Sequence, residues 1–268
     1  MPAAIRPFDL LRVDHGVAAA DRDQIAVEMP LELRLNSEPF SVIMRTPGDD
    51  RHLALGFLLS ESIVRSAADI ERVDVDDVEN VANVWLTRER DAAFRAALGQ
   101  RRQVAMNSSC GLCGRRTLES LALDAAPFKV DWQITPAMVR TLPDALRAEQ
   151  SAFAATGGIH AAGLFDQQGH LEAIAEDVGR HNAVDKLLGR ALLEGRVPLA
   201  GSVLFVSGRT SFEIVQKAYL GGVRVVAAVS APSSLAIDLA RASGMTLLGF
   251  VRDAKCNVYA GAERIQID

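Results

Sequence analysis

Apolar and polar residues alternate along several stretches in the first third of the chain. Every second residue is apolar over 31–35, which is typical of a strand with one buried face. The turn-forming sequence at 36–39 and the stretch 40–44 predict a tight turn and a returning strand. Apolar residues also alternate over 69–86, so we expect further short strands there.

Helical spacing marks other parts of this region. An apolar face repeats over 51–61, which predicts an amphipathic helix, and residues 91–98 have a weaker helical pattern. Thr135 and Pro136 are typical of a helix start, with Thr as N-cap and Pro at the first helical position. We expect Pro143 to interrupt that helix or to begin a second one.

The last hundred residues alternate between short strands and helices. The strands are continuous runs of Val, Leu and Ile, which predicts that both of their faces are covered in an α/β layered fold. We therefore expect an α+β N-terminal part over 1–115 and an α/β domain over 116–268. The predicted strands are 171–175, 202–206, 223–229 and 245–251, and the predicted helices are 183–193 after Asn182 as N-cap, 211–220 and 233–243.

Composition narrows the class of protein. The 268 residues are 49% hydrophobic and 24% charged, which excludes a disordered chain, a collagen-like fibre and a disulfide-stapled miniprotein. The 29 basic and 34 acidic residues leave a net charge of −5, which disfavours non-specific binding to nucleic acid or to an anionic membrane. A local basic pocket remains compatible with this charge.

The sequence also predicts a location. It has no run of 18 apolar residues and no apolar signal region at its start, so we expect neither a transmembrane helix nor a secretory signal. Three cysteines make no disulfide framework and indicate a reducing compartment. We therefore expect a cytoplasmic protein.

Cys110 and Cys113 form a Cys-x-x-Cys motif in a small, polar, glycine-containing segment. Arg115 and Arg116 follow, and cations favour the nucleophilic thiolate. Three uses compete for such a pair: a zinc site, a redox pair, and a sulfur relay in which one cysteine holds a persulfide and the other assists its release. Zinc normally needs four ligands, and nothing in the spacing of Cys256 suggests that it completes a site.

Two further segments combine glycine with ionisable residues. In 156–162, paired glycines permit close approach to a ligand and His160 is a candidate proton donor or anion contact, although a simple turn before a strand explains the same residues. In 176–186, Arg180 and His181 stand between a predicted strand and a helix, where a helix N-terminus favours anions. The alternative is local: Asn182 caps the helix and Arg180 pairs with a neighbouring acid.

Two later strands end in similar polar turns. Ser207, Gly208 and Arg209 follow one strand directly, and a second turn rich in serine occupies 230–234. In open α/β sheets, ligands bind at the edge formed by the carboxyl ends of the strands. For each segment taken alone, a capped turn is the simpler interpretation. The end of the last predicted strand is followed or formed by Phe250, Arg252 and Lys255. These residues suit a ligand that has a flat heterocycle and phosphates. The alternative is a phenylalanine ring in the core and two solvated cations.

Taken together, these segments resemble the FdhD family of sulfur-carrier accessory proteins of formate dehydrogenase. The resemblance spans about residues 25–265, and the blocks 176–186 and 207–213 are more specific than the cysteine pair. Ser62 is a departure, since the family pattern has glycine there. The matching blocks are 35–36, 44–49, 53–58, 60–61, 110–114, 156–162, 176–186, 207–217, 230–236 and 249–252.

The resemblance implies a cytoplasmic sulfurtransferase that acts as a homodimer. It would accept sulfur from a cysteine desulfurase as a persulfide on Cys110, with Cys113 as partner, and serve the formate dehydrogenase catalytic subunit. The acceptor would be the molybdenum (or tungsten) bis-guanine-dinucleotide cofactor. The implied fold is cytidine-deaminase-like. The chain lacks the His-x-Glu and Pro-Cys-x-x-Cys signatures of zinc deaminases, so we expect no metal site and no deamination.

The cofactor would bind at the segments described above. Its phosphates need a focused basic pocket, because the net charge of the chain is acidic. A carrier that binds the cofactor without sulfur chemistry is the alternative function, and a zinc-stabilised structural protein is a more distant one. The expected cofactor-binding residues are Phe250, Val251, Arg252, Asp253, Ala254, Lys255, Arg180, His181, Ser207, Gly208, Arg209 and His160.

Overall fold

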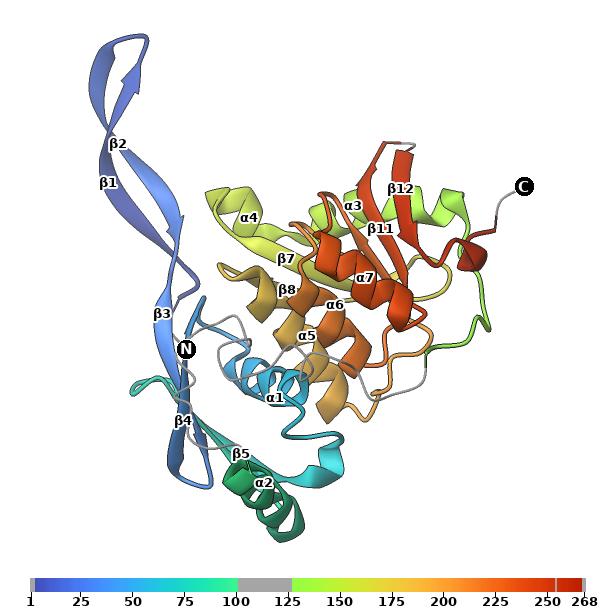
Figure 1. Ribbon diagram of the computed structural model, residues 1–268. Helices are drawn as coiled ribbons and strands as arrows, with labels where there is room; N and C mark the ends of the chain where they lie inside the picture. The colour runs from blue at the N-terminus through green and yellow to red at the C-terminus, as the bar shows by residue number, and fades with distance from the viewer. Residues whose placement is uncertain (1–2, 101–126, 254, 267–268) are drawn as a thin grey trace.

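The computed structural model describes residues 3–100, 127–253 and 255–266 (Figure 1). The chain begins with a long hairpin that extends away from the rest of the molecule. Its strands, β1 (Ile5–Asp14) and β2 (Val17–Ala26), pair antiparallel over their whole length. His15 and Gly16 both have positive φ, 47° and 84°, as a tight two-residue hairpin turn requires. We predicted no element here, because most residues of both strands are exposed and no buried face marks them.

A four-stranded sheet contains the alternating segments of the sequence. Its order is β4-β3-β6-β5, and it confirms the strands predicted in this region. Leu31, Leu33 and Leu35 are buried toward the core, while Glu32 and Arg34 are only partly covered. The elements are β3 (Met29–Leu35), β4 (Glu38–Arg45), α1 (Asp50–Ser60), η1 (Ala67–Asp69), β5 (Ile70–Asp76), β6 (Val81–Leu86) and α2 (Arg88–Gln100).

A six-stranded sheet of order β12-β11-β10-β9-β7-β8 forms the other part of the protein. Strands β9, β10 and β11 are parallel, β7 is antiparallel to β9, and β8 is antiparallel to β7. The carboxyl ends of β8, β9, β10 and β11 and the start of the oppositely directed β7 therefore meet at one edge. The strands are β7 (His160–Phe165), β8 (Leu171–Asp177), β9 (Val203–Val206), β10 (Val225–Ala228), β11 (Thr246–Arg252) and β12 (Lys255–Ala260).

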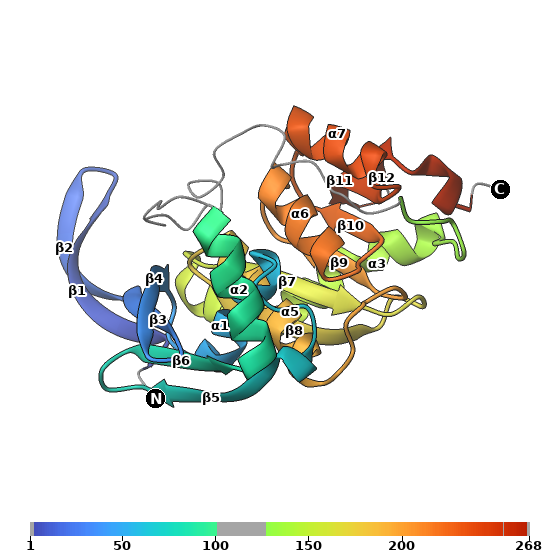
Figure 2. The same cartoon turned by 60° about the horizontal axis from the view of Figure 1, so that its bottom comes forward.

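Helices cover both faces of this sheet (Figures 1 and 2). In β9, Leu204 and Val206 join the core shared with α1, α5, α6 and α7, while Val203 and Phe205 join the core shared with α3. This mixed α/β arrangement confirms the expected fold class; the cytidine-deaminase-like layering stays a prediction. The helices are α3 (Pro136–Glu149), α4 (Ser151–Thr156), α5 (Arg180–Leu193), α6 (Phe212–Leu220) and α7 (Ser234–Ala242), and η3 (Ala262–Arg264) follows β12.

Helices α1 and α5 join the two parts of the chain by direct backbone contact. A Cβ on Gly56 would lie 1.8 Å from the Asp185 carbonyl oxygen, and one on Gly189 would lie 1.9 Å from that of His52. Only glycine permits this approach at these two positions. One hydrophobic core therefore extends from β3 to β11, and the domain division at residue 115 stays a prediction. No helix in the described ranges is long and apolar enough to span a membrane.

Two local predictions were wrong. Helix α3 continues through Pro143, because Met138, Leu142 and Leu146 pack into the sheet on both sides of it and outweigh the lost hydrogen bond. Asn182 does not cap α5, which begins at Arg180. Its side-chain amide instead donates to the Met44 carbonyl oxygen at 2.7 Å and to the Asp177 carboxylate at 2.8 Å.

Candidate functional site

The edge formed by the ends of β8 to β11 brings together segments that are far apart in sequence. His160 begins β7 and pairs with Asp177 at the end of β8. Ala162 pairs with Val206, which places the turn after β9 beside His160. Helices α5, α6 and α7 each begin at this edge, so their N-termini present free backbone N–H groups there.

His160, Arg180 and Gly208 surround a small gap at this edge. A Cβ on Gly208 would lie 3.4 Å from His160 Nδ1 and 3.7 Å from Arg180 Cδ, so the glycine leaves this space open. Burial, followed by the positive charges of Arg180 and His181, lowers the pKa of His160, which is therefore neutral at pH 7. Arg180 Nε is buried and has no hydrogen-bond partner in the described part of the chain.

His181 connects the starts of α5 and α6. Its Nε2 lies 3.1 Å from Ser211 Oγ and 3.0 Å from Glu213 Oε2, and Ser211 Oγ donates to Glu213 at 2.9 Å. The His181 contact and then the Ser211 hydroxyl lower the pKa of Glu213. The same imidazole nitrogen meets both groups, so this cluster holds two helix starts together and is not arranged as a catalytic relay.

The turn after β9 presents hydroxyl and cationic groups. Ser207 Oγ accepts a hydrogen bond from the Ala161 N–H at 2.9 Å, which leaves its own proton available. Thr210 is almost fully buried, and its hydroxyl has no partner among the described residues. Arg209 is exposed. These groups can donate to an anion without first breaking an internal contact.

The end of β11 lies beside the start of β12, where Arg252 is opposite Lys255 in the antiparallel register. Phe250 and Asp253 have positive φ, 53° and 52°, which is a strained backbone for a side chain as large as phenylalanine. Arg252, Asp253 and Lys255 are exposed, whereas the Val251 side chain is buried in the core under α3. Val251 therefore offers a ligand only its backbone.

The acidic residues of 176–186 do not pair with Arg180, contrary to the local alternative. The Glu176 carboxylate accepts from the Ala152 and Phe153 N–H groups at 2.9 and 2.8 Å and so caps α4. Asp177 Oδ2 lies 2.8 Å from Lys186 Nζ, and both side chains are buried. Of this segment's basic side chains, only Arg180 and His181 reach the edge, and Lys186 is unavailable to a phosphate.

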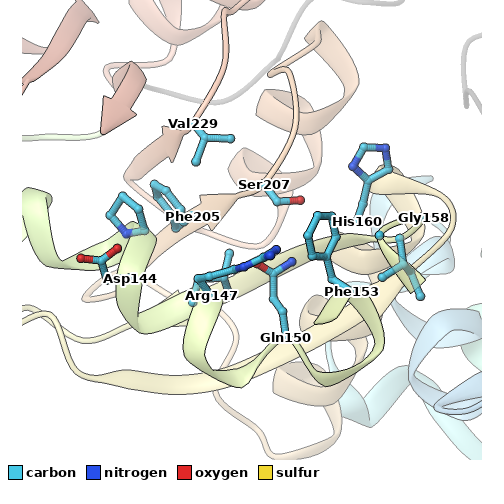
Figure 3. A pocket seen from close by; sticks show the side chains of 13 residues that line it. Asp144, Arg147, Gln150, Phe153, Gly158, His160, Phe205, Ser207 and Val229 are labelled. Carbon is cyan, nitrogen blue, oxygen red and sulfur yellow. The ribbon is translucent and has the colours of Figure 1, made fainter. Parts of the chain in front are cut away.

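A cavity of about 610 Å³ adjoins the edge on the α3 side of the sheet (Figure 3). His160 and Ser207 belong to both the edge and the cavity, which connects the two. We did not predict the participation of Arg147, Gln150 and Phe153, which line the cavity from the α3–α4 region. The only sequence signal was the glycine pair at 157–158, which also lies in its wall.

Three of the predicted site residues lie outside the described ranges: Cys110, Cys113 and Ala254. Their roles stay predictions. Within the described ranges, no three His, Cys, Asp or Glu side chains are grouped to hold a metal ion.

The fold and the edge together define a mixed α/β protein in which helix N-termini, arginines and donors without a partner among the described residues gather at one sheet edge. This arrangement suits a phosphorylated ligand.

Comparison with known proteins identifies the family. The FdhD/NarQ family model matches residues 26–266, and the chain belongs to that family. It is 46% identical over 270 residues to the sulfur carrier protein FdhD of Streptomyces avermitilis, covering 96% of this chain and 94% of the relative. The sulfur carrier protein FdhD of Saccharolobus solfataricus is 44% identical, with 99% and 100% covered.

A solved structure supports the same assignment. The crystal structure of a candidate formate dehydrogenase accessory protein from Desulfotalea psychrophila superimposes with a TM-score of 0.80 at 25% sequence identity. The match covers 98% of this chain and 100% of that chain. The fold described here is therefore shared over its full length, including the six-stranded sheet and its edge.

Proposed function

We propose that this protein is a sulfur carrier in the maturation of formate dehydrogenase. Membership of the FdhD/NarQ family and relatives named sulfur carrier protein FdhD support this function. The sulfur donor in the proposal is a cysteine desulfurase, and the recipient is the molybdenum (or tungsten) bis-guanine-dinucleotide cofactor destined for the dehydrogenase.

The sulfur step uses the two cysteines of the Cys-x-x-Cys motif. The Cys110 thiolate attacks the outer sulfur of the desulfurase persulfide, the donor S–S bond breaks, and the donor cysteine leaves as a thiolate. Cys110 then holds the sulfur as a persulfide. Attack of the Cys113 thiolate on the Cys110 sulfur forms a disulfide and frees hydrosulfide, so the second cysteine assists release.

The sheet edge is the proposed site for the client cofactor, which is the substrate of the protein. The observation on which this rests is the buried Arg180 Nε, which has no hydrogen-bond partner among the described residues and lies beside His160 and the gap at Gly208. An unsatisfied buried donor is costly unless a ligand completes it. The pyrophosphate groups of the cofactor are suitable acceptors for Arg180, Arg209, Arg252 and Lys255, and for the N-termini of α5 and α6.

A mass measurement tests the sulfur step. The protein is incubated with a cysteine desulfurase and cysteine, and the peptide that contains Cys110 is weighed. We expect a gain of one sulfur atom that a reductant removes. Cys110→Ala should abolish this gain, and a variant that gains the same sulfur with the same yield contradicts the role of Cys110.

Cys256→Ala is the matched control for this measurement. Cys256 is partly buried, and burial raises the pKa of its thiol, so little of it is thiolate at neutral pH. Removing it should leave sulfur loading unchanged. If Cys256→Ala abolishes sulfur loading instead, Cys256 is the sulfur carrier and the assignment to Cys110 is wrong.

A cofactor carrier without sulfur chemistry is the second candidate. It is favoured by one observation: the groups gathered at the edge, within the described residues, are arginine, histidine and hydroxyl side chains and not thiols. It predicts that Cys110→Ala and Cys113→Ala still support maturation of formate dehydrogenase, while Arg209→Ala and Arg252→Ala do not. The homodimer expected from the resemblance also stays a prediction, which analytical ultracentrifugation tests.

A further inference from the structure

A buried hydrogen-bond network holds the turn that carries Arg180 and His181 to the sheet edge. Its centre is Asp177, the last residue of β8, whose side chain is fully buried. Asp177 Oδ1 accepts from the Gly179 N–H at 2.8 Å and from the Asn182 side-chain amide at 2.8 Å. This carboxylate therefore fixes the turn from β8 into α5, and Arg180 is the first residue of that helix.

Thr46 fixes the same turn from the N-terminal part of the chain. It lies between β4 and α1 and is only 2% exposed. Its N–H donates to Asp177 Oδ2 at 3.1 Å, and its Oγ1 accepts from the Val178 N–H at 3.1 Å. Two successive residues of the turn are thus tied to one residue that is 131 and 132 positions away in the sequence.

Lys186 completes the network. Its Nζ lies 2.8 Å from Asp177 Oδ2 and donates to the Thr46 and Glu176 carbonyl oxygens at 3.0 and 3.2 Å. An ammonium group has three N–H donors, and these three contacts use all of them. Both charged groups of the network are therefore satisfied within the protein, so any effect that they have on a ligand must pass through the turn.

The turn is rigid, whereas the Arg180 side chain has little to hold it. A Cβ on Gly179 would lie 2.8 Å from Asn182 Nδ2 and 3.4 Å from Asp177 Oδ1, so only glycine lets these two groups close around the turn. Arg180 Nε has no hydrogen-bond partner among the described residues. The position of the guanidinium therefore depends on the backbone from which the side chain extends.

We propose that Thr46 and Asp177 are positioning residues for Arg180, through which the N-terminal part sets where this guanidinium meets an anionic ligand at the sheet edge. A charge-assisted hydrogen bond weakens steeply when its geometry is lost, so a small shift of the turn is enough to weaken binding. The proposal rests on the proposed function for the phosphate-bearing ligand, and it adds the residues that place the cation.

Thr46 is the residue to vary, because a substitution of Asp177 would leave Lys186 buried without its counter-charge. Thr46→Val removes the acceptor of the Val178 N–H and keeps the size of the side chain. Calorimetric titration with GDP measures the effect, since GDP has a pyrophosphate group. We expect the Kd to rise about fivefold, as for the loss of one hydrogen bond. Thr46→Ser keeps the hydroxyl and should bind GDP as the unmodified protein does.

Thr246→Val is the matched control. Thr246 Oγ1 accepts from Arg264 Nη1 at 2.9 Å and donates to the Gly261 carbonyl oxygen at 3.0 Å. These contacts lie at the start of β11, at the end of the sheet opposite the edge. The control should lower the midpoint of urea unfolding at least as much as Thr46→Val and leave the Kd for GDP unchanged. Equal rises of the Kd in the two variants would show that lost stability weakens binding, and would overturn the proposal.

A double variant shows whether Thr46 acts through Arg180. In the Arg180→Ala protein, Thr46→Val should have no further effect on the Kd for GDP, because the side chain that it positions is gone. The NMR signal of the Arg180 Nε–H group, assigned by its loss in Arg180→Ala, should shift in Thr46→Val and not in Thr246→Val. An unchanged signal, or a fivefold effect that persists without Arg180, overturns the proposal.

The sulfur-loading measurement separates this proposal from the proposed function. If Thr46→Val weakens GDP binding through Arg180 but the unmodified protein never gains sulfur on Cys110, the positioning role stands and the sulfur-carrier function fails. If the protein gains sulfur and Thr46→Val binds GDP as the unmodified protein does, the sulfur function stands and the positioning role fails. Absence of GDP binding to the unmodified protein removes the site to be positioned and also overturns the proposal.

Discussion

The charges of residues 176–186 lie in two very different environments. At the contact between α1 and α5, Lys186 pairs with Asp177, and Asp185 pairs with Lys217 at 2.7 Å; all four side chains are buried. At the sheet edge, Arg180 Nε is buried and has no hydrogen-bond partner within residues 3–100, 127–253 and 255–266. The comparison separates two roles of a charged residue. A charge that is paired within the protein stabilises the fold, whereas a charged group that has no partner within the described residues is available to a ligand.

The completed charges also extend beyond this segment. Asp185 accepts from Ser60 Oγ at 2.7 Å, and Arg45 forms a two-bond contact with Asp50 at 2.8 and 2.7 Å. The Ser60–Asp185 contact connects the N-terminal part to α5, whereas the Arg45–Asp50 pair lies within the N-terminal part, between β4 and α1. Well-packed apolar residues can replace a buried ion pair as a whole, but losing one partner leaves a charge that nothing compensates.

The largest expected effect therefore comes from breaking one buried pair. Lys217→Met leaves Asp185 buried with only the Ser60 hydroxyl, which should lower the free energy of unfolding by about 3–5 kcal/mol. Urea unfolding measures the change. Lys129→Met is the control because Lys129 is exposed, and it should change stability by less than about 0.5 kcal/mol. Similar values for the two variants would refute the structural role of the buried pair.

Removing a charged group that lacks a partner among the described residues should weaken ligand binding and leave the free energy of unfolding nearly unchanged. Arg180→Ala removes a buried donor that has no partner in the described structure, so the free energy of unfolding should change by less than about 1 kcal/mol. GDP carries the guanine and pyrophosphate groups of the proposed client cofactor, and its Kd should rise about tenfold in this variant, as expected for the loss of one charge-assisted phosphate contact.

Arg190→Ala provides the matched control on the same helix. Arg190 pairs with Glu194 at 2.9 Å on the exposed side of α5 and should affect neither quantity. If Arg180→Ala strongly lowers the free energy of unfolding and leaves the affinity for GDP unchanged, Arg180 serves the stability of the fold and the distinction between the two environments is wrong.

The smallest expected effect is a pH dependence at the edge. Burial and the charges of Arg180 and His181 lower the folded-state pKa of His160, and Asp177 opposes them only weakly. The unfolded chain therefore binds more protons as the pH falls below about 6.5, and the folded state loses stability there. Unfolding at pH 7.5 and 5.5 should show a smaller acid loss in His160→Gln. An equal or larger loss in the variant would contradict this.

Much of the architecture was predictable because it depends on local periodicity. Strands β3 to β6 and β8 to β11 and helices α1, α5, α6 and α7 lie where the apolar pattern placed them. Pro143 and Asn182 were misassigned because their local preferences competed with packing and a buried hydrogen-bond network. The β1–β2 hairpin went unpredicted because exposed strands have no buried face to leave a pattern.

The sequence by itself determined the strands, the helices, the polar turns and the resemblance to a family, since these depend on neighbouring residues. Only the tertiary structure decided which charges of one segment are buried in pairs and which reach the edge, because the partners Thr46, Ser60 and Lys217 are distant in sequence. It alone also placed Gln150 in a cavity with Phe205. The physical reason is that desolvation and pairing depend on what the fold brings together in space, and spacing along the chain does not specify this.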